Sequence, residues 1–481
     1  MTPSDFAALT PYLVITGGLL VLMLTVSAVR NHLFALIVTL IVFVATLFTL
    51  GSGIGSGAVT IDEFLRIDGY STFFSGLFLV AGIVTAVLAY RYFQGRARYL
   101  EEFYILLVTS TLGAMTMAAA HNFAAFILGL EVMSISLYAM IAYPEEGQAP
   151  LEAAVKYLVL SGVGTTTMLF GMALAYNATG TLVFVEAMSL DGNNDTYLVV
   201  GQAMVLIGVA FKLSLVPFHM WTPDVYHGAP APVTGYIATV SKGAVVALLL
   251  RYIIEVDALD SDALFSLVAL IAMLSMVVGN LLALLQDNLK RILAYSSIAH
   301  MGYLLIALLL AARAADPQMA VEVTMVYLVG YFLMTLAAFG VMTVLSASAA
   351  SDADDLSLYR GLFWRRPLLA GVLATAALSL AGIPLTLGFI AKFYLFAAGI
   401  EGALWSLIWA LIIGSAIGIY YYVRIIFTMT MPAVADTDEH PGVSWEGLGT
   451  VVVLGASLIV LGIYPTPLID LVQDAVRLFG N

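Results

Sequence analysis

Three lysines and one glutamate lie deep inside long apolar stretches of this sequence. Lys212 lies five residues before Pro217, Lys242 lies in the apolar stretch that follows, and Lys392 and Glu131 lie in two others. A charge at membrane depth costs about 2.5–3.5 kcal/mol on insertion scales, so a charged residue there is a functional candidate. Ammonium and carboxylate groups exchange protons, so the chemistry that these residue types predict is proton transfer.

The spacing of Glu131 and Lys212 allows the two side chains to meet. A buried carboxylate alone and a buried amine alone both favour their neutral forms, whereas a pair can hold charge. We therefore expect Glu131 to pair with Lys212, and the opening of that pair to decide whether Lys212 keeps its proton. The alternative is a static ion pair that only fixes helix packing. Three lysines on broken or adjacent helices favour the first interpretation.

The remaining candidates extend this series. Lys242 lies about thirteen residues inside its apolar stretch, too far from the end to reach an interface by snorkelling. Lys392 would end a second half of the path toward the outside, or be an interfacial lysine of a tilted half-helix. His300 could relay protons, because imidazole titrates near neutral pH, or make a hydrogen bond between helices. Lys156 could feed protons into the path, or only anchor the topology.

The elements that must position these residues are membrane spans. The chain is 62% hydrophobic and 10% charged, whereas a soluble domain has about 25% charged residues. The sequence therefore predicts an all-α polytopic membrane protein. A span needs about 20 apolar residues. Fourteen spans are expected, at residues 10–30, 32–51, 70–93, 103–120, 122–143, 152–178, 197–217, 229–253, 262–285, 291–312, 319–347, 367–400, 402–430 and 447–464.

Two of these spans are interrupted, the seventh near Pro217 and the twelfth near Pro384. Proline removes a backbone donor and clashes with the preceding turn, so each helix should break there. Broken helices five spans apart predict two inverted five-helix repeats, spans 4–8 and 9–13, which is typical of transporters. His219 and His227 flank the first break and are weaker candidates. The expected units are residues 1–102, 103–260, 261–430 and 431–481.

Charge is distributed unevenly over the predicted loops. Ten of the 18 lysines and arginines follow odd-numbered spans and four lie on the other side, so both termini are expected outside. The longest polar segment on the basic side, Ser346–Arg366, should contain a short surface helix. The net charge of −13 argues against a nucleic-acid partner, and the lack of cysteine excludes thiolate-bound iron–sulfur clusters. No metal-binding spacing, nucleophile elbow or phosphate loop occurs.

Three longer motifs stand out: Phe211–Tyr226 continued by Gly228–Val233, Arg291–Ile298, and Gly382–Phe393. They resemble the antiporter-like membrane subunits of respiratory complex I, and the resemblance covers nearly the whole chain. Lys392 makes the third motif similar to that of bacterial subunit N, the counterpart of mitochondrial subunit 2, because subunit M has glutamate there. The long lateral helix of subunit L is also missing.

The resemblance implies a role for each buried charge. Glu131 and Lys212 would form the input pair, Lys242 the central relay, and Lys392 the output group. The implied reaction is NADH oxidation by quinone coupled to proton export, catalysed by a translocase in the bacterial inner membrane. This chain would hold no cofactor and no metal, while FMN, iron–sulfur clusters and quinone would bind to partner subunits. Its neighbours would be subunit M, the small K-type subunit and membrane lipids.

Two other functions remain open. A subunit of a multi-subunit cation/proton antiporter, or of a membrane-bound hydrogenase, would share the break and the lysines. Flavin and iron–sulfur clusters in the purified complex would separate complex I from the antiporter. The third reading is a scaffold that conducts nothing and uses its polar residues only for packing.

Overall fold

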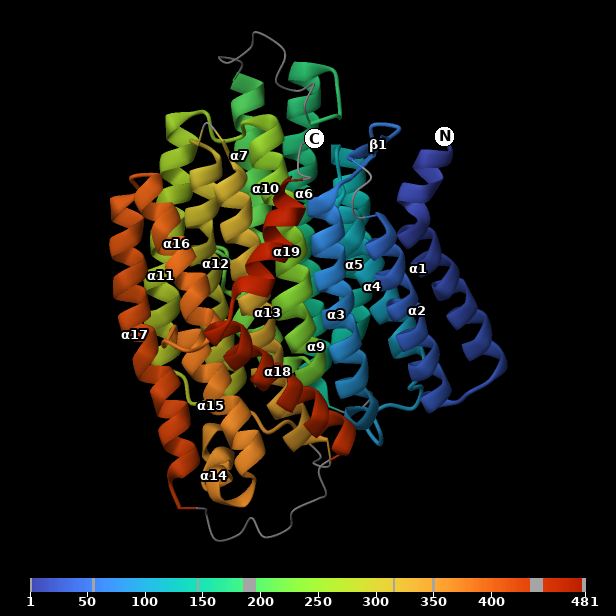
Figure 1. Cartoon of the computed structure of the whole chain (residues 1–481), viewed down its shortest axis with the longest axis vertical. Helices are drawn as coiled ribbons and strands as arrows, with labels where there is room; N and C mark the ends of the chain where they lie inside the picture. The colour runs from blue at the N-terminus through green and yellow to red at the C-terminus, as the bar shows by residue number, and fades with distance from the viewer. Residues whose placement is uncertain are drawn as a thin grey trace.

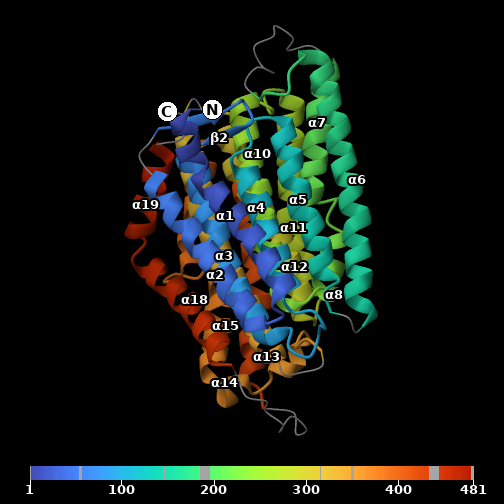
Figure 2. The same cartoon turned by 90° about the vertical axis from the view of Figure 1, so that its right-hand side faces the viewer.

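The computed structural model describes residues 2–53, 57–144, 147–184, 196–314, 316–347, 351–432 and 444–477. Over these residues the chain is a bundle of long helices with one small β-hairpin (Figure 1, Figure 2). Eleven of the described helical spans are long and apolar enough to cross a membrane, and three further apolar helices are shorter. The predicted all-α polytopic membrane fold is confirmed.

The first half of the bundle holds the helices on which Glu131, Lys212 and Lys242 lie. A short π-helical turn, η2, interrupts the eighth span directly before Lys242. The elements in chain order are α1 Pro3–Ala28, α2 His32–Gly53, β1 Val59–Ile61, β2 Leu65–Ile67, α3 Gly69–Tyr92, α4 Glu102–Ala118, α5 Phe123–Ile141, α6 Gln148–Thr179, α7 Thr196–Lys212, α8 Trp221–Gly228, α9 Ala231–Tyr236, η2 Ile237–Ser241 and α10 Lys242–Val256.

The second half holds His300 and Lys392. The linker predicted to contain a short surface helix has one 3₁₀ turn and one short α-helix, so this expectation is confirmed. The elements are α11 Asp262–Leu284, α12 Leu289–Ala311, α13 Gln318–Ser346, η3 Leu356–Tyr359, α14 Leu362–Arg365, α15 Pro367–Ala381, α16 Leu387–Glu401, α17 Trp405–Thr430, α18 Trp445–Ile463 and α19 Thr466–Arg477.

Both predicted breaks are present. α7 ends at Lys212 and α8 begins nine residues later, at Trp221, while α15 and α16 are separated by residues 382–386. Each break contains backbone in the left-handed region, at Ser214 (φ 62°) and at Gly382 (φ 82°). Because this conformation ends an α-helix, the last carbonyl groups of each half-helix need partners outside the regular helical pattern. Loop amides pair with some of them, as Leu215 N donates to Ala210 O and Ile383 N to Leu378 O, and a polar side chain pairs with another, as Lys392 donates to Ala381 O.

Burial increases toward three central spans. In an apolar stretch of 18 residues within each span, the buried share of residues is 94% in Ala231–Val256, 94% in Leu289–Ala311 and 83% in Gln318–Ser346. The corresponding share is only 22% in α1. Exposed apolar side chains such as Leu24 and Phe48 cover the periphery, as expected for surface that faces lipid. The central spans must therefore bury whatever polar side chains they carry.

The two ends of the bundle differ. α1 begins and α19 ends at one end, which we call the terminal face, and α14 lies at the opposite end, the α14 face (Figure 1).

The β1–β2 hairpin and α19 were not predicted, because the hairpin strands have only three residues each and α19 is amphipathic, not uniformly apolar. The division into two inverted units at residues 103–260 and 261–430 stays a prediction.

Candidate functional site

Lys212 is the last residue of α7, directly before the first break, and only 4% of it is exposed. Its Nζ donates hydrogen bonds to Ser134 Oγ on α5 at 3.0 Å and to Ser161 Oγ on α6 at 2.5 Å. Ser161 also accepts a hydrogen bond from the Tyr138 hydroxyl at 2.8 Å. The amine is therefore held by hydroxyl groups of two neighbouring helices.

Glu131 lies one turn before Ser134 on α5 and is partly exposed at the side of the bundle. Its Oε1 accepts a hydrogen bond from Thr165 Oγ1 at 3.0 Å. Glu131 and Lys212 are both described, and no ion pair joins them within 4.0 Å, so the expected direct contact is not formed. The reason is local. Ser161 and Thr165 lie four residues apart on one face of α6, where Ser161 accepts a hydrogen bond from the Lys212 amine and Thr165 donates one to the Glu131 carboxylate.

Lys242 is the first residue of α10 and is 1% exposed. Its Nζ donates to Ser297 Oγ on α12 at 2.7 Å and lies 5.6 Å from the centre of the Tyr226 ring. Ser297 also shares a hydrogen bond with the Tyr331 hydroxyl of α13 at 2.6 Å. The π-helical turn before Lys242 is a backbone irregularity that is frequent at functional sites.

His300 lies one turn beyond Ser297 on α12 and is 1% exposed. Its Nδ1 lies 2.6 Å from the Tyr327 hydroxyl, and its Nε2 lies 3.4 Å from the Tyr422 hydroxyl. Tyr422 in turn shares a short hydrogen bond with Ser296. Both ring nitrogens therefore have hydroxyl partners, which suits a relay and equally a fixed hydrogen bond between helices.

Lys392 lies on α16, beyond the second break, and is partly buried. Its Nζ donates to the carbonyl oxygen of Ala381, the last residue of α15, at 3.0 Å, and lies 5.3 Å from the centre of the Tyr303 ring. The lysine thus satisfies a carbonyl that the end of α15 leaves without a helical partner. The side chain is directed at the break inside the protein, in contrast to an interfacial lysine.

The three weaker candidates lie at or near the first break. Lys156 on α6 is 40% exposed in its side chain and forms ion pairs with Glu152 at 2.8 Å and Asp224 at 3.0 Å. His219 is buried in the segment between α7 and α8. His227 ends α8, and its Nε2 lies 3.1 Å from Asp354 Oδ2 in the α13–α15 linker. None of these contacts joins them to the buried lysines.

The hydroxyl groups around the lysines were missed by the sequence reasoning. Serine, threonine and tyrosine are common in apolar spans, so a single one carries no signal. A weak signal was helical spacing, because some of them lie three or four residues from a predicted charge on the same helix. The missed residues are Ser134, Tyr138, Ser161, Thr165, Tyr226, Ser296, Ser297, Tyr303, Tyr327, Tyr331 and Tyr422.

This arrangement suits a group that gains and loses a proton. A hydroxyl accepts a hydrogen bond from an ammonium and donates one to a neutral amine, so it can serve both states of a lysine. A carboxylate would stabilise only the charged state. Within the described ranges no cluster of three or more histidine, aspartate or glutamate side chains could hold a metal ion.

The chain is similar to known membrane proteins over most of its length. Residues 120–418 match the family described as "NADH:quinone oxidoreductase/Mrp antiporter, TM". A chain of respiratory complex I from Thermus thermophilus is 31% identical, with a TM-score of 0.81 over 96% of this chain and 98% of that one. A chain of an archaeal membrane-bound sulfane sulfur reductase is 25% identical, with a TM-score of 0.82 over 98% and 97%. A chain of the Mrp complex from Dietzia sp. DQ12-45-1b shares the fold at 18% identity, with a TM-score of 0.86 over 99% and 97%.

Proposed function

Because this chain belongs to the NADH:quinone oxidoreductase/Mrp antiporter family of membrane subunits, we propose that it carries protons for bacterial respiratory complex I. In this proposal it is the subunit N type and couples NADH oxidation by quinone to proton export. It holds no redox centre, and FMN, iron–sulfur clusters and quinone bind to partner subunits. Subunit M and the small K-type subunit are its proposed neighbours.

One observation carries the proposal. Lys212 and Lys242 are almost completely buried, and their head groups contact serine hydroxyls. A lysine that only fixed the packing would be expected to keep a buried carboxylate partner, because an unpaired buried charge is costly. Hydroxyl partners instead allow the amine to exist with and without its proton. We therefore assign Lys212 and Lys242 as proton carriers, Glu131 and Lys392 as the input and output groups, and His300 as a lesser relay.

The choice of complex I is supported by overall similarity. The Thermus complex I chain is 31% identical over nearly its full length, compared with 25% for the sulfane sulfur reductase chain. The lysine at position 392 favours subunit N over subunit M within the resemblance stated above. In this proposal the α14 face, which carries the basic loops, lies in the cytoplasm and both termini lie on the outer side of the bacterial inner membrane; the excess of lysine and arginine in those loops supports this orientation.

The test is the Lys242→Ala variant in the assembled complex. We expect NADH-driven proton pumping and quinone reduction to fall together by about tenfold or more, the scale of losing one positioned proton-transfer group. Pumping is followed by a pH-sensitive dye in inverted membrane vesicles, and assembly by gel electrophoresis of the native complex. Arg313→Ala, which removes an exposed cation at the terminal face, is the matched control. Full coupled activity in assembled Lys242→Ala would contradict the proposal.

A subunit of a cation/proton antiporter is the second candidate, favoured by the fold that the chain shares with the Mrp chain. Purification of the native complex separates the two. Flavin and iron–sulfur clusters that co-purify with this chain would support complex I. A complex without them that exchanges sodium for protons would support the antiporter.

A further inference from the structure

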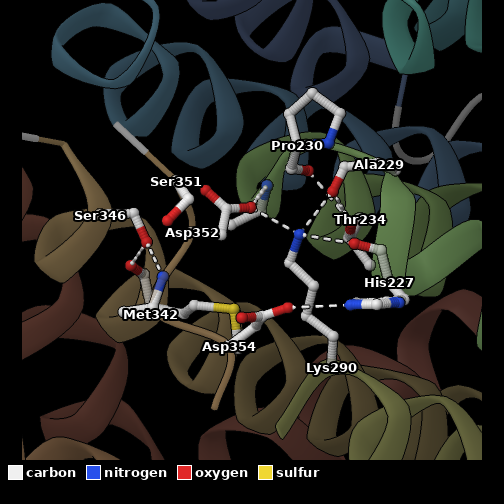
Figure 3. Close-up of polar contacts among 12 residues, drawn as sticks. His227, Ala229, Pro230, Thr234, Lys290, Met342, Ser346, Ser351, Asp352 and Asp354 are labelled. Atoms are coloured by element: carbon white, nitrogen blue, oxygen red, sulfur yellow. Dashed lines mark hydrogen bonds and ion pairs between the residues drawn. The ribbon is translucent and has the colours of Figure 1, made fainter. Parts of the chain in front are cut away.

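A cavity of about 420 Å³ lies at the α14 face, outside the lysine series described above. Six titratable or charged side chains line it: Tyr92, Arg96, His227, Lys290, Asp352 and Asp354. Figure 3 shows four of them, His227, Lys290, Asp352 and Asp354. The six come from four segments, namely the end of α3 with the loop after it, the end of α8, the first turn of α12 and the α13–α15 linker.

Exposure decreases stepwise across this cluster. The side chains of His227 and Asp354 are 48% and 24% exposed, whereas those of Asp352 and Lys290 are 9% and 2% exposed. His227 Nε2 lies 3.1 Å from Asp354 Oδ2, and Lys290 Nζ lies 2.5 Å from Asp352 Oδ2. The cavity therefore has an exposed acid–base pair at its mouth and a buried acid–base pair at its floor.

The floor of the cavity leads toward Lys242. Lys290 Nζ donates to the carbonyl oxygen of Ala229 at 2.7 Å. Thr234 Oγ1 lies 3.2 Å from the same oxygen and 3.3 Å from the carbonyl oxygen of Tyr226. The ring of Tyr226 is the one whose centre lies 5.6 Å from Lys242 Nζ. The Lys290 head group and Lys242 are thus separated by one short polar segment, the junction of α8 and α9.

Helix α12 connects the same two points independently. Lys290 and Ser297 are seven residues apart, which places them on one face of the helix about 10 Å apart along its axis. Ser297 Oγ is the hydroxyl that receives the hydrogen bond from Lys242. The floor of the cavity and the Ser297 contact of Lys242 therefore lie along one face of α12, within a distance that a few water molecules can bridge.

We propose that this cavity is the opening through which protons from the cytoplasm reach Lys242, an inference that rests on the proposed proton-carrying function. His227 and Asp354 collect the proton at the mouth. The Asp352–Lys290 pair passes it inward. Lys156 has no part in this route, because its amine lies between Glu152 and Asp224 and does not line the cavity.

The transfer through the buried pair balances in protons and charge. The Lys290 ammonium gives its proton inward to a neutral Lys242, and the Lys290 amine then takes a proton that the mouth has collected. Asp352 stays a carboxylate throughout, and its 2.5 Å contact with the Lys290 ammonium is restored. One proton has moved from the cavity to Lys242, and no net charge is left at the floor. Arg96, 2.9 Å from Asp352, keeps its charge throughout.

The test is the double variant His227→Ala, Asp354→Asn in the assembled complex, measured in inverted vesicles whose cytoplasmic side faces the medium. We expect the rate of NADH-driven pumping to fall by about a hundredfold, the lower end of the effect of a positioned acid–base group. Imidazole added to the medium should restore much of the rate, because it is a mobile acid–base group small enough for the space left by His227. Asp287→Asn, an exposed carboxylate beside α12 that does not line the cavity, should pump normally.

Each outcome decides the matter. Slow pumping that imidazole restores supports the route, because a structural defect would not respond to the buffer. Wild-type pumping, or slow pumping that imidazole leaves unchanged, overturns it. If the double variant does not assemble, His227→Ala alone is judged by the same criterion. Lys242→Ala measured in parallel separates the two proposals: if it pumps normally, the proton-carrying function fails, and if only the cavity variant pumps normally, only this route fails.

Discussion

At Lys242 the head group depends on one hydroxyl, Ser297 Oγ, which lies 2.7 Å from Nζ and also contacts the Tyr331 hydroxyl. Ser297→Ala removes this link and leaves buried polar groups unpaired, at a cost of about 1–3 kcal/mol. We expect the pumping rate to fall by about tenfold, which corresponds to about 1.4 kcal/mol. Ser297→Thr keeps a hydroxyl and should retain most of the rate. Equal pumping by the alanine and threonine variants in vesicles would show that Ser297 is not part of the path.

A second residue-scale prediction concerns stability at the terminal face. Asp68 and Arg251 form an ion pair at 2.9 Å in which neither side chain is exposed. Asp68→Asn leaves buried Arg251 with only its longer ion pair, to Glu255 at 3.5 Å, and breaking a buried ion pair typically costs about 3–5 kcal/mol. Asp262→Asn is the matched control, because Asp262 pairs with Arg313 at the surface and such pairs contribute about 0–1 kcal/mol. The melting temperatures of the purified complexes should therefore differ, with a clear drop only for Asp68→Asn.

Sequence reasoning predicted where the candidate residues lie better than which groups they contact. The positions of Lys212 and Lys392 beside the two breaks, and of Lys242 deep inside its span, followed from their distance to prolines and to apolar boundaries. The contact between Glu131 and Lys212 did not follow, because opposite charges on adjacent helices meet only if no nearer polar group intervenes. Two hydroxyls of α6 do intervene. Which hydroxyls reach a lysine depends on helix rotation, which spacing along the chain does not fix.

At the scale of elements, the second break depends on close contact between its two half-helices. Gly388 on α16 lies so near α15 that a Cβ atom would come within 1.9 Å of the Ser379 carbonyl oxygen. The Gly388 amide also donates to Ser379 Oγ at 3.0 Å. This contact fixes the position of α16, and with it the register of Lys392 against the end of α15.

We therefore expect Gly388→Ala to push the two half-helices apart, with a loss of stability of about 1–3 kcal/mol from overpacking. Lys392 should also lose its hydrogen bond to Ala381, so proton pumping should decrease in whatever complex assembles. Gly371→Ala on α15 is the matched control, because nothing lies within 4 Å of the added Cβ. Melting temperature and pumping rate are measured for both. An unaffected Gly388→Ala variant would mean that the break tolerates separation.

The elements themselves were largely predictable. Long apolar runs and internal prolines determine where spans begin, end and break, since backbone groups in lipid must be paired within the chain. Two elements escaped prediction. The hairpin strands are too short for a detectable alternation, and α19 follows Pro465 as an amphipathic helix whose apolar side, at Leu468, Val472 and Val476, is buried. Its mean hydropathy therefore resembled a loop more than a span.

At the scale of the whole molecule, polar residues are concentrated where burial is greatest. The three central spans carry Lys242, His300 and their hydroxyl partners, and the peripheral helices separate them from lipid. The cavity lined by Asp352 and Lys290 opens at one end of the bundle, the α14 face. At the α14 face the linker after α13 covers the interior, and Asp352 holds the linker in place through Tyr92, Arg96, Lys290 and the amide of Ala231.

This attachment predicts how the α14 face responds to acid. Burial alone would raise the pKa of Asp352, but ion pairing and hydrogen bonding with Lys290, the Tyr92 hydroxyl and Arg96 lower it below the usual value. Asp354 and Tyr359 are its other titratable neighbours. A carboxyl group whose pKa is lower in the folded than in the unfolded protein stabilises the fold when the pH is above the unfolded-state pKa of the group. This contribution is lost as the pH falls through the folded-state pKa. The linker should therefore loosen on acidification and not at alkaline pH.

Hydrogen exchange measures this loosening directly. The amide of Leu289 donates to the Asp354 carbonyl at 2.6 Å, and the amide of Leu356 donates to the Asp287 carbonyl at 3.0 Å, so both report on whether the linker is attached. Their protection factors, corrected for intrinsic exchange, should decrease as the pH falls below the unfolded pKa of aspartate, about 3.9. Asp352→Asn should lower protection at neutral pH and abolish the acid step, whereas Asp355→Asn, an exposed aspartate of the same linker, should change neither. Acid-induced loosening that persists in Asp352→Asn would assign the response to another group.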